Sequence, residues 1–273
     1  MQVIACQTDI AWHDKAANFS RVQELLAPVG IRPGALVVLP EMFATGFSLD
    51  VPQIAETEGG PTDRFLAELA ARYECCVVAG VVRQKPSGKA VNLCVVFSAD
   101  GSMLASYEKL HPFSFGGEDR LYERGKEVEI FEQGDFSVAP LVCYDLRFPE
   151  VFRHAVLQGA QLLVVIANWP KERDEHWTAL LKARAIENQA YVVGVNRVGR
   201  DPHLEYIGHS QIIDPRGHIV AAAAEGPAAL VADVELAEVL EYRQSFPALR
   251  DMRPEFLGKP GVAGPRTGSG TRP

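Results

Sequence analysis

Seven short apolar runs rich in valine and isoleucine recur along this 273-residue chain, and they constrain its fold more than any other feature. Strands that are covered on both faces have such nearly continuous hydrophobic sequences, because neither face meets water. None of the runs reaches the roughly 20 residues that a membrane-spanning helix requires, so we expect no membrane association. The runs predict buried strands at Val3–Cys6, Ala35–Leu39, Cys76–Val82, Val91–Phe97, Phe136–Val142, Leu162–Ala167 and Tyr191–Asn196.

Amphipathic segments alternate with these predicted strands. They predict helices at Asn18–Leu26, Thr62–Tyr73, Phe148–Gln158 and Glu175–Gln189. Prolines at positions 61 and 149 are typical of helix starts. The sequence DPRG at 214–217 lies between two further apolar runs, which indicates a β-hairpin. The regular alternation of strands and helices predicts an α/β or layered αββα protein.

The composition changes only near the C-terminus. From about Gly258 the chain reads GKPGVAGPRTGSGTRP, which has almost no apolar side chain to bury. We therefore predict one domain over residues 1–257 and a flexible tail over residues 258–273. The N-terminal sequence MQVIACQTDI lacks the basic region and the long apolar stretch of a signal peptide, which predicts a cytoplasmic protein.

Charge and cysteine content narrow the possible functions. The 27 basic and 35 acidic side chains give a net charge of −8, and no run of lysine or arginine indicates a nucleic-acid partner or an anionic membrane surface. An odd number of cysteines without a CxxC motif or metal-ligand spacing argues against a disulfide framework and against zinc. We expect neither a metal nor another cofactor, and the open question is whether one thiol is a nucleophile. The five thiols belong to Cys6, Cys75, Cys76, Cys94 and Cys143.

Three extended segments end on a side chain that can do chemistry. Glu41 follows ALVVLP, Lys109 follows MLASYE, and Cys143 stands where APLV turns towards a helix. Because ligands of α/β sheets bind beyond the carboxyl ends of strands, we expect the three ends to converge. Taken singly, each residue has an ordinary explanation, since a buried cysteine is often a small hydrophobe, a glutamate can cap a loop and a lysine is usually a solvated cation.

The residues around these positions carry a more specific signal. LPE-MFATGF, YEKLHPF and CYDLRFPE resemble, in the same order, the three catalytic motifs of the nitrilase superfamily of carbon–nitrogen hydrolases. The resemblance runs from VIACQTDI at the start to DVELAEVLEYRQSFP and leaves only the tail outside it. It implies a four-layer αββα sandwich of the nitrilase type, in which two sheets pack face to face with helices outside. It also implies a homo-oligomer, commonly a dimer in which two sandwiches stack.

The resemblance implies roles that are chemically sensible at these positions. Cys143 would attack an amide carbonyl and form a thioester. Glu41 would take up the thiol proton, deliver it to departing ammonia and then activate water. Lys109 would stabilise the tetrahedral oxyanion together with a backbone N–H, that of Tyr144. A nearby ammonium also favours the thiolate form of the nucleophile.

A second glutamate completes the site in this superfamily by positioning the lysine. Glu118, in FGGEDRLYERG, matches it best through its spacing to Gly125. Asp119 and Glu123 are close alternatives, and the whole segment also reads as a charged surface loop.

Further residues are expected at the substrate pocket. Asn168 and Trp169 follow the predicted strand Leu162–Ala167 in IANWP, where family members line the acyl site, although Trp169 is equally a candidate core anchor. Arg147 would pair with a substrate carboxylate or would fix its loop through Asp145. In the segment HWTALLKARAIENQAYV, Arg184 and Glu187 have the spacing of a structural ion pair.

Within the superfamily, KLHPF, CYDLRFPE, ANWP-x-x-R and ARAIENQAYVVGVNRVG most resemble the ω-amidase branch. That resemblance implies hydrolysis of the terminal amide of α-ketoglutaramate or α-ketosuccinamate, with Arg147 or Arg173 holding the substrate carboxylate. The partners expected are therefore a small amide and water. The alternatives are another aliphatic amidase, a nitrilase or an N-carbamoyl hydrolase, and a non-catalytic member that binds a metabolite or a protein.

Overall fold

The computed structural model describes residues 1–253 and residue 255, and these residues form two six-stranded sheets and a separate two-stranded hairpin, β10–β11. The strand order is β14-β1-β2-β3-β4-β5 in the first sheet and β13-β12-β9-β8-β7-β6 in the second. The strands are β1 (Gln2–Gln7), β2 (Leu36–Val38), β3 (Cys76–Gln84), β4 (Ala90–Phe97), β5 (Met103–Glu108), β6 (Phe131–Gln133), β7 (Phe136–Val142), β8 (Leu162–Ala167), β9 (Tyr191–Asn196), β10 (Val198–Arg200), β11 (Glu205–Ile207), β12 (Gln211–Ile213), β13 (Ile219–Ala222) and β14 (Ala228–Asp233).

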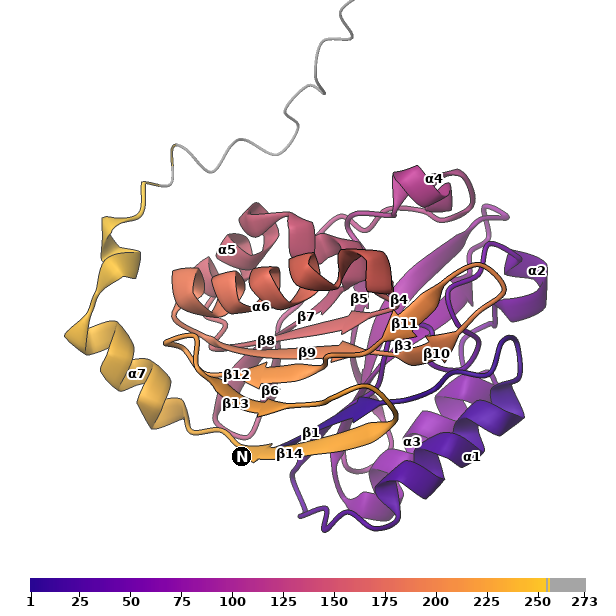
Figure 1. Ribbon diagram of the computed structural model, residues 1–273, viewed down its shortest axis with the longest axis horizontal. Coiled ribbons are helices and arrows are strands. Elements are labelled where there is room, and N and C mark those ends of the chain that lie inside the picture. Colours follow the sequence, from indigo (N-terminus) through magenta and orange to yellow (C-terminus); the bar gives the residue numbers. More distant parts are fainter. Residues whose placement is uncertain (254, 256–273) are drawn as a thin grey trace, which may run out of the picture.

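Helices connect and cover these strands (Figure 1). The α-helices are α1 (Lys15–Leu26), α2 (Val51–Ile54), α3 (Pro61–Tyr73), α4 (Glu118–Leu121), α5 (Pro149–Leu157), α6 (Asp174–Asn188) and α7 (Leu236–Ser245). Short 3₁₀ turns are η1 (Ser114–Gly116), η2 (Cys143–Arg147), η3 (Lys171–Arg173) and η4 (Ala248–Asp251). None of the helices in the described residues is long and apolar enough to cross a membrane.

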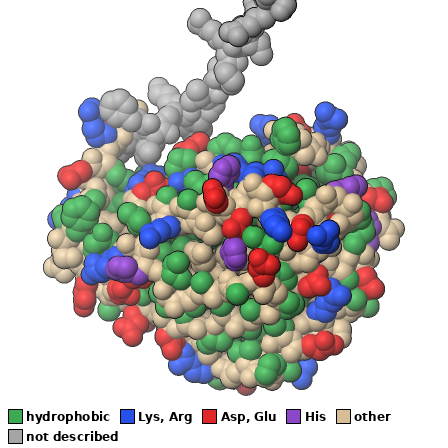
Figure 2. Space-filling view, in the orientation of Figure 1, with side chains coloured by type: hydrophobic (Ala, Val, Ile, Leu, Met, Phe, Trp, Pro, Cys, Tyr) green, Lys and Arg blue, Asp and Glu red, His purple; other side chains and the backbone are tan. Residues whose placement is uncertain are grey.

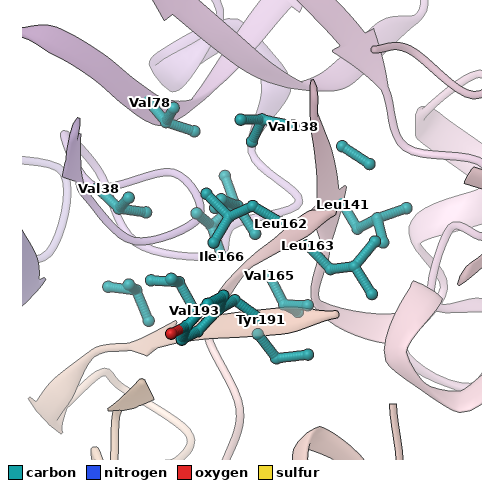
Figure 3. Close-up of a cluster of buried hydrophobic side chains, with 14 of the residues drawn as sticks. Val38, Val78, Val138, Leu141, Leu162, Leu163, Val165, Ile166, Tyr191 and Val193 are labelled. Atoms are coloured by element: carbon teal, nitrogen blue, oxygen red, sulfur yellow. The ribbon is translucent and has the colours of Figure 1, made fainter. Parts of the chain in front are cut away.

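The sheets and helices stack in four layers. Helices α1 and α3 cover the outer face of the first sheet, where Val22 and Leu66 pack against Val37 in one apolar cluster, and α5 and α6 cover the outer face of the second sheet. Between the sheets, Val38 and Val78 belong to the same buried cluster as strand residues of the second sheet (Figure 3). This arrangement confirms the predicted αββα sandwich.

The alternation of side chains along each strand explains why the strands read as continuous apolar runs. In β1, Val3 contacts the cluster between the sheets, whereas its neighbour Ile4 contacts the cluster under α1 and α3. Each such side chain contributes about 1.5–3 kcal/mol by full burial, so a polar residue at a comparable depth needs partners of its own. On the face drawn in Figure 2, acidic and basic side chains are interspersed with hydrophobic ones.

All seven predicted strands and all four predicted helices are present, with ends that differ by a few residues at most. The predicted hairpin is confirmed by two backbone hydrogen bonds across its turn, from Asp214 N to His218 O (2.9 Å) and from Gly217 N to Asp214 O (3.0 Å). The predicted tail, residues 258–273, lies outside the described residues. The sequence analysis did not predict β14, which pairs antiparallel with β1 and returns the chain to the first sheet.

The directions of the strands bring several strand ends to one edge of the sandwich. Strands β1, β2 and β3 are mutually parallel, as are β7, β8 and β9. Strand β5 runs in the same direction as β3, because β4 is antiparallel to both of them. The carboxyl ends of β2 and β5 in the first sheet therefore lie at a common edge, as do those of β7 and β8 in the second.

Candidate active site

Four predicted site residues meet at this edge. Lys109 follows β5, and its Nζ lies 2.9 Å from Glu41 Oε1 and 2.9 Å from Glu118 Oε2. The three side chains are almost entirely removed from solvent, with exposed fractions of 0–1%. Cys143 Sγ faces them from the second sheet, where it lies 4.0 Å from Asn168 O and interacts electrostatically with Glu41 and Lys109. The structure thus brings the thiol, the ammonium and two carboxylates into one cluster.

Tight backbone turns present two of these side chains. Cys143 has a positive φ of 46°, where β7 turns abruptly into η2, and Met42, directly after Glu41, has a φ of 43°. Left-handed backbone at a residue other than glycine costs about 1–3 kcal/mol and is kept only where the surroundings hold it. Gly80 of β3 supports the second turn, because a Cβ there would lie 2.4 Å from Glu41 Cα and 2.4 Å from Met42 N.

The buried charges stabilise one another. Burial alone would raise the pKa of Glu41, but the Lys109 ammonium and hydrogen bonds from Lys109, Asn92 and Asn168 bring that pKa below its ordinary value of 4.5. Burial would likewise lower the pKa of Lys109, but the carboxylates of Glu118 and Glu41 raise it well above the ordinary value. Glu41 is therefore a carboxylate and Lys109 an ammonium at neutral pH.

The pKa of the Cys143 thiol responds to opposing effects of its surroundings. Burial and the Glu41 carboxylate raise the pKa of Cys143 well above its ordinary value, and the opposing effect of Lys109 is smaller. Lys109 favours the thiolate, as expected, but its effect on the pKa of Cys143 is smaller than those of burial and of the Glu41 carboxylate. At rest the cluster holds a thiol proton beside a carboxylate that can accept it.

The other four cysteines lie inside the apolar layers. Cys76 and Cys94 belong to the cluster between the sheets, and Cys6 and Cys75 to the cluster under α1 and α3. Burial raises the pKa of Cys75 and of Cys76 to about 12, and it raises the pKa values of Cys6 and Cys94 further. These thiols stay protonated and act as packing residues.

Two asparagines that hold Glu41 complete the cluster. Asn92 of β4, which the sequence analysis did not single out, donates from Nδ2 to Glu41 Oε1 (2.7 Å) and to Glu118 Oε1 (2.9 Å). Asn168, predicted at the pocket, donates from its backbone N to Glu41 Oε2 (2.8 Å) and from Nδ2 to Glu41 O (2.6 Å). The available signal for Asn92 was a polar amide inside the otherwise apolar run AVNLCVVF.

The structure distinguishes the three candidates for the second glutamate. Glu118 is fully buried at the start of α4 and also accepts a hydrogen bond from Phe113 N. Glu123 instead accepts from Ser87 Oγ (2.6 Å) at the surface, and Asp119 is partly exposed. Gly125, which follows this segment, donates from its N to Lys109 O (2.9 Å). A Cβ at this position would lie 2.1 Å from Glu108 O, which explains why a glycine is needed.

Beside Cys143 opens a pocket with aromatic walls and two cations. Its lining includes Phe47, Phe113, Cys143, Tyr144, Trp169 and Tyr206, together with Arg147 and Arg173. The guanidinium of Arg147 lies 4.6 Å from the centre of the Trp169 ring, and that of Arg173 lies 5.7 Å from the centre of the Phe113 ring. Within the described residues, neither guanidinium is paired with a carboxylate.

The alternatives left open for Arg147 and Trp169 are now separated. Arg147 does not bond to Asp145, whose buried carboxylate accepts from Tyr107 and His111 instead, so the reading of an Arg147–Asp145 pair is wrong. Trp169 is buried, with an exposed fraction of 3%, and its indole Nε1 donates to Arg173 O (2.7 Å). It therefore anchors the core and lines the pocket as well.

The remaining predicted contact is structural. Arg184 and Glu187 of α6 form the expected ion pair at 2.9 Å. Arg184 also donates from Nη2 to Leu146 O (2.7 Å), which supports the end of η2. In the described part of the chain, no group of three or more His, Cys, Asp or Glu side chains is arranged to hold a metal ion.

A thiol beside a buried carboxylate and ammonium, next to an apolar pocket, has the groups required for hydrolysis through a covalent acyl intermediate. The fold is that of hydrolases built on a four-layer sandwich. Residues 2–244 match the family model described as carbon-nitrogen hydrolase, and the chain belongs to that family. It is a hydrolase of carbon–nitrogen bonds other than peptide bonds.

The chain is similar in sequence and in structure to several named members of this family. The chain is 40% identical to the omega-amidase YafV of Yersinia enterocolitica, over 92% of this chain and 96% of the relative. It is 32% identical to the 2-oxoglutaramate amidase of Bacillus subtilis, over 93% and 98%. Among solved structures, a CN-hydrolase superfamily protein from Xanthomonas campestris with an arsenic adduct in its active site has a TM-score of 0.87 and 34% identity, covering 97% of this chain and 99% of that one.

Proposed function

We propose that this protein is an ω-amidase. Its substrates would be small dicarboxylates that carry a terminal amide, such as α-ketoglutaramate and α-ketosuccinamate, and its products the dicarboxylate and ammonia. The names of the relatives in Yersinia enterocolitica and Bacillus subtilis support this substrate class. The resemblance of the ANWP-x-x-R and CYDLRFPE segments to that branch agrees with it.

The observation that carries the proposal is the pair of guanidiniums in the pocket of Cys143. Arg147 and Arg173 line the same pocket, and the charge of Arg173 helps to lower the pKa of Arg147, after the larger effect of burial. Two cations that repel each other, and that have no carboxylate partner among the described residues, favour an anionic ligand. A substrate that carries its amide towards Cys143 and its carboxylate towards these arginines fits both ends of the pocket.

In the first half of the proposed reaction, Cys143 attacks the amide carbonyl. Its thiol proton passes to Glu41 as the S–C bond forms, which explains why a thiol with a raised pKa is a competent resting state. Lys109 and the backbone N–H of Tyr144 stabilise the oxyanion. When the C–N bond breaks, Glu41 returns the proton to the departing nitrogen, and ammonia leaves a thioester on Cys143.

In the second half, water hydrolyses the thioester. Glu41, again a carboxylate, takes a proton from the water as its oxygen attacks the thioester carbonyl. Lys109 and the Tyr144 N–H stabilise the second oxyanion. Collapse of this intermediate breaks the C–S bond, the proton returns to the Cys143 sulfur, and the carboxylic acid product is released.

A panel of amides tests the proposal. Ammonia release would be measured with α-ketoglutaramate, α-ketosuccinamate, glutamine, neutral aliphatic amides, nitriles and N-carbamoyl amino acids. We expect the largest kcat/KM with the two keto acids. Faster turnover of a nitrile, an N-carbamoyl compound or an uncharged amide would contradict the assigned substrate class. If no compound yields ammonia, the protein is a non-catalytic member that binds a metabolite or a protein.

Two arginine variants test the carboxylate site. Loss of a charge-assisted hydrogen bond costs about 1.5–3 kcal/mol, so Arg147→Ala or Arg173→Ala should raise KM for α-ketoglutaramate about tenfold or more. KM for a neutral amide such as butyramide should change little. Arg72→Ala is the matched control, because Arg72 lies over the Tyr73 ring on the surface of α3, away from the pocket. Equal KM values for both arginine variants and wild type would contradict the assignment.

Assembly and location belong to the same proposal. Leu157 of α5 and Ile186 of α6 are large apolar side chains with exposed fractions of 46% and 45% on the outer helical layer. Their exposure supports a homo-oligomer, commonly a dimer in this superfamily, which light scattering of the purified protein would test. A cytoplasmic location and the absence of a nucleic-acid partner stay predictions of the sequence.

A further inference from the structure

Asp145 connects the two sheets next to the active site. This residue is two positions after Cys143, and its side chain is completely buried. Its carboxylate accepts four hydrogen bonds, from Tyr107 Oη (2.8 Å), His111 N (3.0 Å), His111 Nδ1 (2.8 Å) and Val142 N (3.1 Å). A buried carboxylate is costly unless donors surround it, so the four bonds define its position closely.

The partners of Asp145 lie within two residues of Lys109 or Cys143 in the sequence. Tyr107 stands two residues before Lys109, and His111 stands two residues after it. Val142 directly precedes Cys143. Tyr107 Oη also accepts from Leu110 N (3.3 Å), which closes the turn that follows the lysine. One carboxylate therefore holds the segment of the lysine, from the first sheet, against the segment of the nucleophile, from the second.

We infer that Asp145 is a positioning residue that sets the separation between Lys109 Nζ and Cys143 Sγ. This inference rests on the proposed function, in which those two groups act on one carbonyl. Effective catalysis requires reacting groups to be placed to within a fraction of an ångström, and a displacement of about 1 Å can cost about 100-fold in rate. Neither Asp145 nor any of its three partner residues lines the substrate pocket, so the effect of these contacts should fall on rate more than on binding.

Other contacts keep the rest of the site in place when the Asp145 contacts are weakened. Glu41 is joined to the second sheet separately, through the backbone and side chain of Asn168. The far end of η2 is held by Arg184, which donates to Leu146 O, and by the stacking of Arg147 on Trp169. Weakening the Asp145 contacts should therefore lower kcat and leave substrate binding, and hence KM, nearly unchanged.

The test removes single atoms from these contacts. Tyr107→Phe deletes one donor to Asp145, and Asp145→Asn keeps the size of the side chain but removes its charge and one acceptor oxygen. Tyr191→Phe is the matched control, because it deletes a buried hydroxyl that bonds Glu238 at the opposite end of β9. We expect kcat to fall about tenfold or more in the first two variants, with KM within threefold of wild type, and the control to keep full activity.

A substrate-independent measurement accompanies the kinetics. Lys109 is the group that favours the Cys143 thiolate, so a displaced lysine should slow alkylation of Cys143 by iodoacetamide about fivefold or more in Tyr107→Phe. Turnover and alkylation both within twofold of wild type in this variant would overturn the inference, as would an equal loss in Tyr191→Phe. If wild type hydrolyses no ω-amide, the proposed function fails by itself, and the alkylation rates still decide the role of Asp145.

Discussion

The two sheets contribute different kinds of chemistry to one site. The first sheet supplies Glu41, Asn92 and Lys109, which lie in a fully buried network of charges and amides. The second sheet supplies Cys143, which is partly exposed to a pocket whose walls include Trp169. The charged groups of the first sheet are thus withdrawn from water, which strengthens their mutual interactions, whereas the thiol of the second sheet faces the pocket. The site is therefore formed where the two sheets meet, and neither sheet alone contains it.

Removing the nucleophile tests the contribution of the second sheet and should have the largest effect. Cys143→Ala leaves no atom to form the thioester, so we expect kcat to fall by about 10⁴-fold or more. Cys75→Ala and Cys76→Ala, which change buried packing thiols, should retain nearly full turnover. Ammonia release measures all three variants, and activity in Cys143→Ala similar to wild type would rule out the assigned nucleophile.

Removing the proton acceptor tests the contribution of the first sheet. Glu41→Gln keeps the side-chain size but cannot take up the thiol proton, so kcat should fall about 10²–10⁴-fold. In Lys109→Met, kcat should fall about 10²–10³-fold, because the group that stabilises the oxyanion is lost. Circular dichroism would show whether each variant folds, and mass spectrometry of a single turnover would compare the thioester on Cys143. Full thioester formation at the wild-type rate in Glu41→Gln would contradict its role in acylation.

Gly80 tests how closely the first sheet must fit the turn at Glu41. Gly80→Ala places a Cβ 2.4 Å from Glu41 Cα, and such overpacking costs about 1–3 kcal/mol in stability. Activity should fall together with the free energy of unfolding, because Glu41 itself must shift. Gly30→Ala is the control, since a Cβ there meets no atom within 4 Å. Chemical denaturation measures the stability difference, and identical curves for the two variants would contradict the close fit.

The pH dependence of kcat/KM should show the smallest of these effects, and it reports on Glu41 alone. The pKa of Glu41 lies below 4.5, so its carboxylate persists to lower pH than that of an ordinary glutamate. The acid limb of kcat/KM should accordingly lie below pH 4.5, and the contribution of Glu41 to stability should be lost only as pH falls through its folded-state pKa. Asn92→Leu removes one stabilising donor and should move the acid limb to higher pH. If the acid limb of kcat/KM lies at the same pH in Asn92→Leu and in wild type, a group other than Glu41 titrates there.

Much of the fold follows from the local sequence because a buried strand and an amphipathic helix each leave a periodic pattern. Val3–Cys6 and Leu162–Ala167 could be predicted for this reason, whereas short β10 and partly exposed β14 have no comparable pattern. Glu41, Lys109 and Cys143 were predicted from their motifs and strand-end positions. The prediction of Glu118 depended on resemblance alone.

The features that sequence analysis missed are those that depend on register and burial. Asn92 reaches Glu41 because β4 pairs with β3 in one particular register, with Val82 opposite Asn92. Gly80 matters for a close approach between segments about forty residues apart. The direction of the pKa shift of Cys143 depends on its burial and on the carboxylates near it. The two alternatives for Arg147 could not be distinguished from the sequence, because the approach of Tyr107 to Asp145 is tertiary.

The pairing of β14 with β1 has a consequence for synthesis of the chain. The strand that closes the first sheet, Ala228–Asp233, leaves the ribosome after the residues of both sheets that form the site. Until then, one edge of β1 has its backbone donors and acceptors open to pairing with other chains. Antiparallel closure over such a long sequence separation also makes the final docking slow. The first sheet can therefore be completed only late in translation, when every residue assigned to the active site has already been made.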